Sequence, residues 1–220
     1  MDKRVVLLAA LGLTALSATP AAAQADAWQR KWFWGAQGGV FLYQTPTTTK
    51  REMAITAGGH WLITSKRSAL LIGFDQVMFP DSSTSQVADP IVASGLRQVD
   101  FTSGRRIQAM LYAIPSDGVL QVMLGGGFAI QQISNATPAG PFLTLAELTN
   151  ANVIVANQDT RAFFVLSGGF QLRKGRWALF ANYQFMPPAK NFLISSGQHA
   201  MMAGLRFALT TAHEDVTTDR

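Results

Sequence analysis

The chain has 220 residues, a formal net charge of +5 and no cysteine. The lack of cysteine excludes disulfides, thiolate metal sites and cysteine nucleophiles, and three histidines leave little material for a zinc site. Charged residues make up 14 % of the chain, against about 25 % in an ordinary soluble domain. The chain is also rich in glycine and phenylalanine, and beyond the N-terminus it has no apolar run long enough for a transmembrane helix. This composition favours a β-protein that contacts lipid.

The N-terminus has the pattern of a secretory signal peptide. A short basic region, Asp2-Lys3-Arg4, precedes an apolar stretch at 5–18 and an alanine-rich segment in which Ala23-x-Ala25 fits a cleavage site. A membrane-anchoring helix is the alternative, but the stretch is short and ends in a processing signal. We therefore expect cleavage of residues 1–25, a mature domain at 26–209 and a polar tail at 210–220.

The mature chain alternates apolar and polar residues in eight segments, which predicts eight β-strands with one apolar face each. The segments are 32–43, 52–64, 68–79, 98–114, 119–132, 161–173, 176–186 and 198–209. A soluble β-sandwich also alternates in this way, so two further features must decide between the folds.

The first feature is the length of the connections. Short connections at 65–67, 115–118 and 174–175 carry turn residues, and they alternate with longer ones at 44–51, 80–97, 133–160 and 187–197. Short turns at one end and long loops at the other are typical of an outer-membrane barrel, whose short turns are periplasmic and whose long loops are extracellular.

The second feature is the position of the tryptophans. Four of them share the lipid-facing parity at the short-turn end, as expected of an aromatic girdle at headgroup level: Trp32, Trp34, Trp61 and Trp177. Phe79, Phe101 and Phe185 are the aromatic candidates for the opposite end. Face and height together predict an eight-stranded antiparallel up-and-down transmembrane β-barrel in the bacterial outer membrane.

The last segment carries a family resemblance. Gly204-x-x-Phe207-x-Leu209 resembles the signal that small outer-membrane barrels present to the barrel-assembly machinery. Met202 stands where a polar residue is usual, and the chain continues past the aromatic residue. Over about residues 28–209 the chain resembles the eight-stranded barrels of the OmpA membrane-domain and OmpX type. The resemblance implies a monomer among outer-membrane lipids, including lipopolysaccharide.

Eight charged residues have inward parity and are expected to form a polar interior network. They are Glu52, Asp75, Asp100, Arg106, Arg161, Arg173, Arg176 and Arg206. Buried charges need partners, so we expect carboxylate–guanidinium pairs across the barrel. Such a network is either a selectivity constriction or a polar plug, and the plug is favoured because barrels of this size leave no aqueous channel.

Catalysis has weak candidates. Ser195, Ser196 and His199 lie together near the start of the last segment, and some small barrels modify lipid A with serine and histidine. A serine nucleophile needs a base within hydrogen-bond reach and an acid to orient that base, and the only acid on offer is Glu147 on a distant loop. We expect no enzyme, no cofactor, no metal and no nucleic-acid partner.

Binding is the more credible activity. Arg97 and Arg105 could contact lipopolysaccharide phosphates at the outer interface, since guanidinium favours bidentate phosphate contacts. For Arg105 the alternatives are a snorkelling side chain or a bulge at Gly104. In the long loop 133–160, Thr144-x-x-Glu147 resembles a capping box, which predicts a short helix at 145–151, while residues 153–155 could extend a strand.

The sequence therefore predicts a structural, envelope-integrity or surface-binding barrel. Lipid A modification and uptake of a small hydrophobic solute are the alternatives. An apolar external loop suggests either a partner surface or a lid over the barrel mouth.

Overall fold

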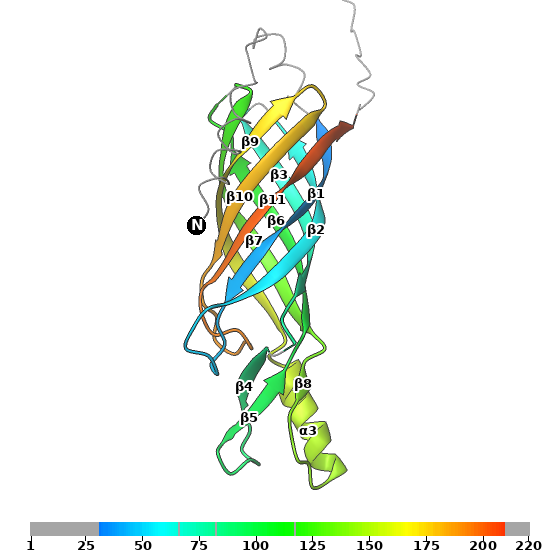
Figure 1. Cartoon of the computed structure of the whole chain (residues 1–220), viewed down its shortest axis with the longest axis vertical. Helices are drawn as coiled ribbons and strands as arrows, with labels where there is room; N and C mark the ends of the chain where they lie inside the picture. The colour runs from blue at the N-terminus through cyan, green and yellow to red at the C-terminus, as the bar shows by residue number, and fades with distance from the viewer. Residues whose placement is uncertain (1–30, 66, 82, 117, 210–220) are drawn as a thin grey trace, which may run out of the picture.

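The computed structural model describes residues 31–65, 67–81, 83–116 and 118–209. The predicted signal peptide and polar tail lie outside these residues. The described residues form a closed barrel of eight antiparallel strands in the order β1-β11-β10-β9-β7-β6-β3-β2, with a small extension beyond one end (Figure 1). The predicted eight-stranded up-and-down barrel is confirmed.

The barrel strands run close to the predicted segments. They are β1 (Trp32–Tyr43), β2 (Glu52–Thr64), β3 (Ser68–Met78), β6 (Ser103–Ala113), β7 (Leu120–Ser134), β9 (Thr160–Lys174), β10 (Trp177–Met186) and β11 (Gln198–Leu209). The remaining elements are β4 (Thr84–Ala88), β5 (Leu96–Asp100), β8 (Thr137–Pro138) and α3 (Leu145–Ala156). Strand pairing between β1 and β11 closes the sheet, so the barrel wall has no free edge.

The fourth predicted segment, 98–114, is two strands rather than one. The chain enters the barrel wall only after Phe101 and Thr102, so β6 belongs to the barrel and β5 to the extension, where it pairs with β4 and β8. Phe79 and Phe101 were expected at an outer aromatic band. Both are buried instead, because they pack with Tyr43 at the barrel mouth with ring centroids 4.9 Å apart for Tyr43–Phe79 and for Phe79–Phe101.

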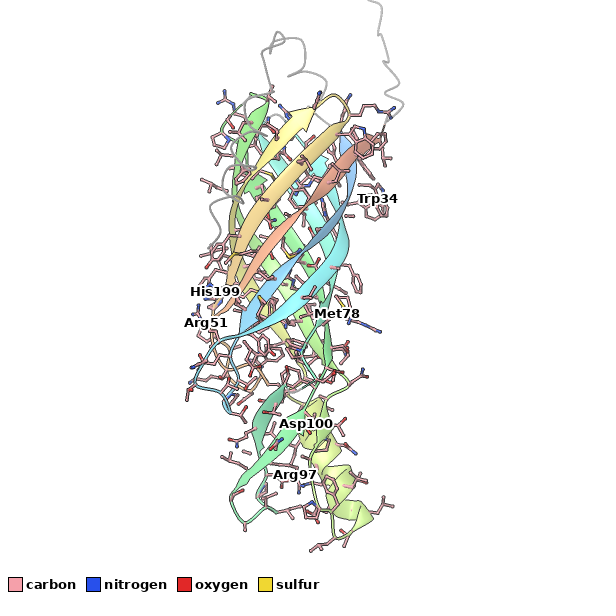
Figure 2. The ribbon with its side chains drawn as sticks, viewed as in Figure 1. Trp34, Arg51, Met78, Arg97, Asp100 and His199 are labelled. Atoms are coloured by element: carbon pink, nitrogen blue, oxygen red, sulfur yellow. The ribbon has the colours of Figure 1, made fainter. Side chains whose placement is uncertain are left out.

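The outward face of the barrel is apolar. Its exposed side chains include Ile55, Phe74, Ile107, Phe128 and Leu179. The four tryptophans of the predicted girdle are exposed at the short-turn end, where Trp34 packs against Trp61 with centroids 4.4 Å apart; Figure 2 labels Trp34 at the end opposite the extension. No helix among the described residues is long and apolar enough to cross a membrane.

The loop module lies beyond the other end of the barrel (Figure 1). We use this name for residues 83–100 and 135–158, which contain β4, β5, β8 and α3. The predicted helix start is confirmed, since the Thr144 hydroxyl accepts from the Glu147 amide at 3.1 Å. The Glu147 carboxylate reaches back to the Leu143 amide at 3.0 Å, one residue before the position that a full capping box uses. The helix runs on to Ala156, so the predicted strand at 153–155 is wrong. The helix buries Ala151 and Val155, which are part of the apolar tract of this loop.

Close approach between β1 and β11 requires glycine at one position of the pair Gly38-Gly39. A Cβ at Gly39 would lie 1.9 Å from the Met201 carbonyl oxygen, whereas a Cβ at Gly38 would meet nothing nearer than 3.6 Å. Gly39 faces the narrow interior and Gly38 faces outward, so only the first is required by packing.

We therefore expect Gly39→Ala to lower the free energy of unfolding by about 1–3 kcal/mol, because the added methyl group forces β1 away from β11. Urea unfolding of the refolded protein in lipid vesicles, followed by tryptophan fluorescence, measures this change. Gly38→Ala is the matched control and should not lower stability. Equal losses in the two variants would contradict the assignment.

Candidate functional site

The barrel interior is polar at mid-height and is centred on the carboxylate of Asp75 on β3. This carboxylate accepts from Arg106 Nε at 3.1 Å, Arg106 Nη2 at 2.8 Å, Gln108 Nε2 at 3.2 Å and the Gln37 amide. Asp75 and Arg106 are wholly buried, and they stand opposite each other in the β3–β6 register. The expected carboxylate–guanidinium contact is therefore made between neighbouring strands rather than across the barrel.

A second buried guanidinium, Arg206 on β11, is surrounded by neutral groups. Its Nε donates to His60 Nε2 at 2.8 Å and its Nη1 donates to Gln171 Oε1 at 2.8 Å. Its guanidinium carbon also lies 3.8 Å from the centre of the Phe180 ring. Nε2 of His60 must be unprotonated to accept this bond. The charge of Arg206 is therefore stabilised by the His60 and Gln171 acceptors and by the face of the Phe180 ring.

The other five residues of the predicted network do not lie in this interior. Glu52 is half-buried at the first position of β2, and Asp100 is exposed on β5 in the loop module, where it accepts from Gln98 at 3.0 Å (Figure 2). Arg161 is exposed near the start of β9. Arg173 and Arg176 donate to the carbonyl oxygens of Gly118 and Ala208 at the short-turn end. Parity predicts the side of a strand but not the depth of a residue in the barrel.

The mouth of the barrel is filled rather than open. Phe192, Leu193 and Ile194 of the last long loop are buried between the barrel and the loop module. Phe192 packs on Phe163 with centroids 5.2 Å apart, and the Ser85 hydroxyl donates to the Leu193 carbonyl at 2.6 Å. The segment 192–194 therefore covers the mouth, a role that the sequence offered to loop 133–160 as one of two alternatives.

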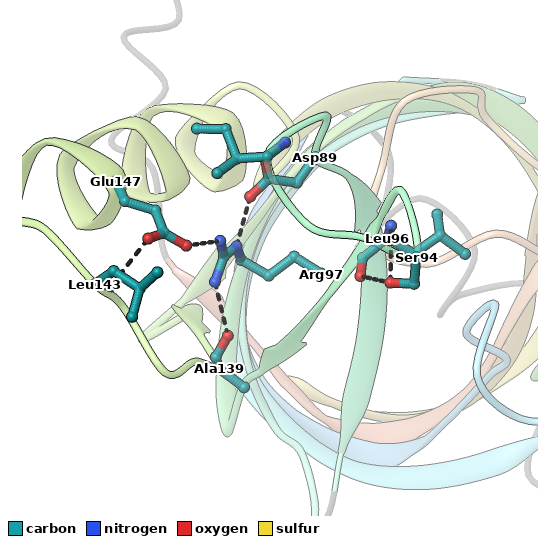
Figure 3. A network of polar contacts seen from close by, with 8 residues as sticks. Asp89, Ser94, Leu96, Arg97, Ala139, Leu143 and Glu147 are labelled. Atoms are coloured by element: carbon teal, nitrogen blue, oxygen red, sulfur yellow. Dashed lines mark hydrogen bonds and ion pairs between the residues drawn. The ribbon is translucent and has the colours of Figure 1, made fainter.

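Arg97 locks the loop module together (Figure 3). Its Nε donates to Asp89 at 2.5 Å, one terminal nitrogen to Glu147 at 2.9 Å and the other to the Ala139 carbonyl at 3.2 Å. Its guanidinium also lies 4.6 Å from the centre of the Phe142 ring. One side chain thereby joins the β4–β5 hairpin to the start of α3 and to the strand-like segment before it.

This lock overturns one binding prediction. The Arg97 side chain is 3 % exposed and its donors are occupied by Asp89, Glu147 and Ala139, so it does not present a guanidinium to lipid phosphates. Arg105 by contrast is exposed on the outer face, flanked in register by Gln76 and Gln132. The β3–β6–β7 registers run through this position without a bulge at Gly104.

Sequence reasoning missed Asp89 and Glu147 as partners of Arg97. The signal was present, because they are the only acidic residues in the segments 83–99 and 134–158. Arg97 stands alone as a cation among apolar and uncharged neighbours, and a buried charge must find a counter-charge.

The catalytic candidates are not assembled into a nucleophile–base pair. The Ser195 and Ser196 hydroxyls donate to the carbonyl oxygens of Gln44 and Gly197, and the His199 ring pairs through Nδ1 with the Tyr183 hydroxyl. His199 faces outward on β11 near the loop end (Figure 2). Among the described residues no three histidine, aspartate or glutamate side chains cluster as metal ligands do.

The residues of the predicted assembly signal lie at the closing strand. Gly204 on β11 faces the barrel interior, and a Cβ at this position would lie 2.1 Å from the Ala36 carbonyl oxygen. Phe207 faces outward and packs on Trp177 with centroids 4.6 Å apart, and Leu209 is the last residue of β11.

Comparison with solved structures identifies the fold. The crystal structure of Neisserial surface protein A (NspA) aligns with a TM-score of 0.56 and 10 % identity, over 81 % of this chain and 97 % of that chain. The chain has the fold of the small eight-stranded outer-membrane barrels. The N-terminal barrel domain of Pseudomonas aeruginosa OprF also aligns, with a TM-score of 0.47 and 10 % identity over 82 % of this chain and 98 % of that one. No family model and no curated protein matches the sequence.

The interior ion pair generates one prediction. Asp75→Asn leaves the buried Arg106 without a counter-charge and should lower the free energy of unfolding by about 3–5 kcal/mol. The double variant Asp75→Asn/Arg106→Gln should lose less than Asp75→Asn alone, because no unpaired charge remains. Urea unfolding in vesicles measures both, and Asp100→Asn is the exposed control with an expected change within about 0.5 kcal/mol. A double variant with a lower free energy of unfolding than Asp75→Asn would contradict this pairing.

The lock generates a second prediction, about pH. The hydrogen bond from Arg97 holds the pKa of Asp89 below its ordinary value, and the Leu143 amide followed by Arg97 lowers the pKa of Glu147. Because both folded pKa values lie below the unfolded ones, the lock contributes its full stability above the ordinary carboxyl range. That stability is lost as the pH falls through the folded pKa values.

Carboxyl ¹³C NMR titration of the protein in nanodiscs tests this directly. We expect both groups to titrate below their ordinary pKa values, and Arg97→Gln to raise the pKa of Asp89 more than that of Glu147, which keeps its bond from Leu143. Unchanged pKa values in Arg97→Gln would show that the lock does not form.

Proposed function

We propose that the protein is a bacterial outer-membrane barrel that acts as a closed anchor and holds the loop module outside the cell for binding. The membrane location is supported by the apolar outer face, the row of tryptophans at one end and the NspA-like fold. The binding role is carried by the lock at Arg97, which orders a module that barrel closure does not need. Ordered loops on a rigid scaffold are where binding residues concentrate.

The two alternative functions are less well supported. Uptake of a solute needs a path, and the mouth is packed with Phe41, Tyr43, Phe79 and the segment 192–194. Lipid A modification needs an activated serine, and Ser195 and Ser196 are bonded to main-chain oxygens rather than to His199. The polar interior is accordingly proposed as a plug that stabilises the barrel.

Two further partners belong to this proposal. Arg105 is exposed on the outer face near the loop end and stands in register with Gln76 and Gln132, which supports a contact between its guanidinium and lipopolysaccharide phosphates. Gly204, Phe207 and Leu209 would be recognised by the barrel-assembly machinery. The protein is proposed to work as a monomer.

Surface labelling of intact cells tests the topology. Because the chain has no cysteine, single cysteines can be placed at will. Thr149→Cys on α3 should react with a membrane-impermeant maleimide on intact cells, since it lies exposed on the loop module. Lys174→Cys, exposed at a short turn, is the matched control and should react only after the outer membrane is permeabilised.

The opposite labelling pattern would contradict the proposed orientation. A changed lipid A acyl pattern in cells that produce the protein, or steady conductance steps in planar bilayers, would replace the binding role with one of the alternatives.

A further inference from the structure

Away from the barrel, the surface of the loop module has no free charge. The one exposed charged side chain of the module, Asp100, stands at the end of β5 that leads into β6. The segments 83–99 and 134–158 contain three charged residues, Asp89, Arg97 and Glu147. All three are paired with one another in the lock, and their side chains are 1 %, 3 % and 14 % exposed. The neighbouring exposed positions of α3 are uncharged, among them Thr149, Asn150 and Asn152. Beyond Asp100, the module therefore offers no free charge for an ion pair with a partner.

The far tip of the module is apolar instead. Ile91 and Leu96 flank the turn between β4 and β5, and Leu143 and Leu145 stand at the start of α3. Leu143 is 91 % and Leu145 78 % exposed, and the other two are about half exposed. Figure 1 shows that the β4–β5 turn and the first turn of α3 form the end of the molecule farthest from the barrel.

The tip consists of two segments, the β4–β5 turn and the start of α3. Between them lies a hollow of about 320 Å³ lined by Val92, Leu96 and Leu143, with Arg97 and Glu147 also at its wall. The lock joins the hairpin to α3, so the two backbone segments that carry the four aliphatic side chains are held together before any partner arrives. Such pre-organisation lowers the entropy cost of binding.

The chemistry of the tip selects among partners. Protein hot spots are enriched in tryptophan, tyrosine and arginine, and binding to acidic surfaces needs free lysine or arginine. The tip presents neither, because its exposed large side chains are leucine and isoleucine, and Phe142 and Arg97 are stacked on each other. Leucine and isoleucine are among the side chains that enter lipid hydrocarbon most favourably.

We propose that the tip inserts its four aliphatic side chains into a neutral, zwitterionic phospholipid bilayer that faces the cell. This inference rests on the proposed function, since it requires the module to lie outside. The distance of the tip from the barrel directs it away from the membrane that holds the barrel and toward an opposing one (Figure 1). The protein would then tether two membranes without a receptor.

The test uses the full chain in nanodiscs mixed with phosphatidylcholine vesicles. Ser94→Cys in the tip turn is labelled with an environment-sensitive fluorophore, and Gln86→Cys on the exposed face of β4 is the control site. We expect a blue shift at position 94 on addition of vesicles, no shift at position 86, and co-sedimentation of the nanodiscs with the vesicles.

Leu143→Asp/Leu145→Asp should weaken vesicle binding by about tenfold or more, because charge is expelled from hydrocarbon. The matched control is Asn150→Asp/Asn152→Asp, which adds the same charge to the exposed flank of α3 and should stay within about twofold of the parent chain. Retained heat-modifiable gel mobility in both variants establishes that the barrel has folded.

Other outcomes overturn the inference. Binding only to anionic vesicles would replace the aliphatic contact with an electrostatic one. Nanodiscs that associate with each other without vesicles, and lose this in Leu143→Asp/Leu145→Asp, would make a second copy the partner. Absence of vesicle binding while Thr149→Cys is labelled on intact cells would refute the bilayer but keep the proposed function. Absence of that labelling would refute both.

Discussion

The carboxylate of Asp75 is the interaction on which the barrel interior depends. It accepts hydrogen bonds from Gln37 on β1 and from Arg106 and Gln108 on β6, so one buried charge joins β3 to its neighbour β6 and to β1, which lies beyond β2. A charge in such a place is tolerated only when paired and bonded, which leaves the lumen at this level filled with side chains. A barrel closed in this way has its specific surfaces at its ends and on its outer face.

Alternation made the barrel predictable, because a strand between lipid and a narrow interior must place every second side chain on the same face. Parity places Asp75, Arg106 and Arg206 inward, and the structure has them there. The same rule misplaced Asp100. The alternation of apolar and polar residues begins before Phe101, in β5, although the chain joins the barrel wall only at β6. Depth depends on where strands tilt and end, and the sequence pattern does not carry that information.

The loop module marks the second limit of sequence reasoning. The capping box at Thr144 and Glu147 predicted the start of a helix from local chemistry alone. The course of residues 153–155 and the burial of Arg97 depend instead on contacts between segments about 50 residues apart, such as Arg97 with Glu147. One cation and two acids in an otherwise uncharged region were the clue to this pairing. Their burial in the lock leaves Asp100 as the exposed charge of the module.

A closed barrel carries an ordered module, and amide hydrogen exchange of the protein in nanodiscs tests this most directly. Peptides from β5 and α3 should be protected to an extent comparable with those from β6 and β7, because the lock at Arg97 and the packing of 192–194 hold the module against the mouth. Exchange of β5 and α3 at the rate of unstructured loops, beside a protected barrel, would contradict it.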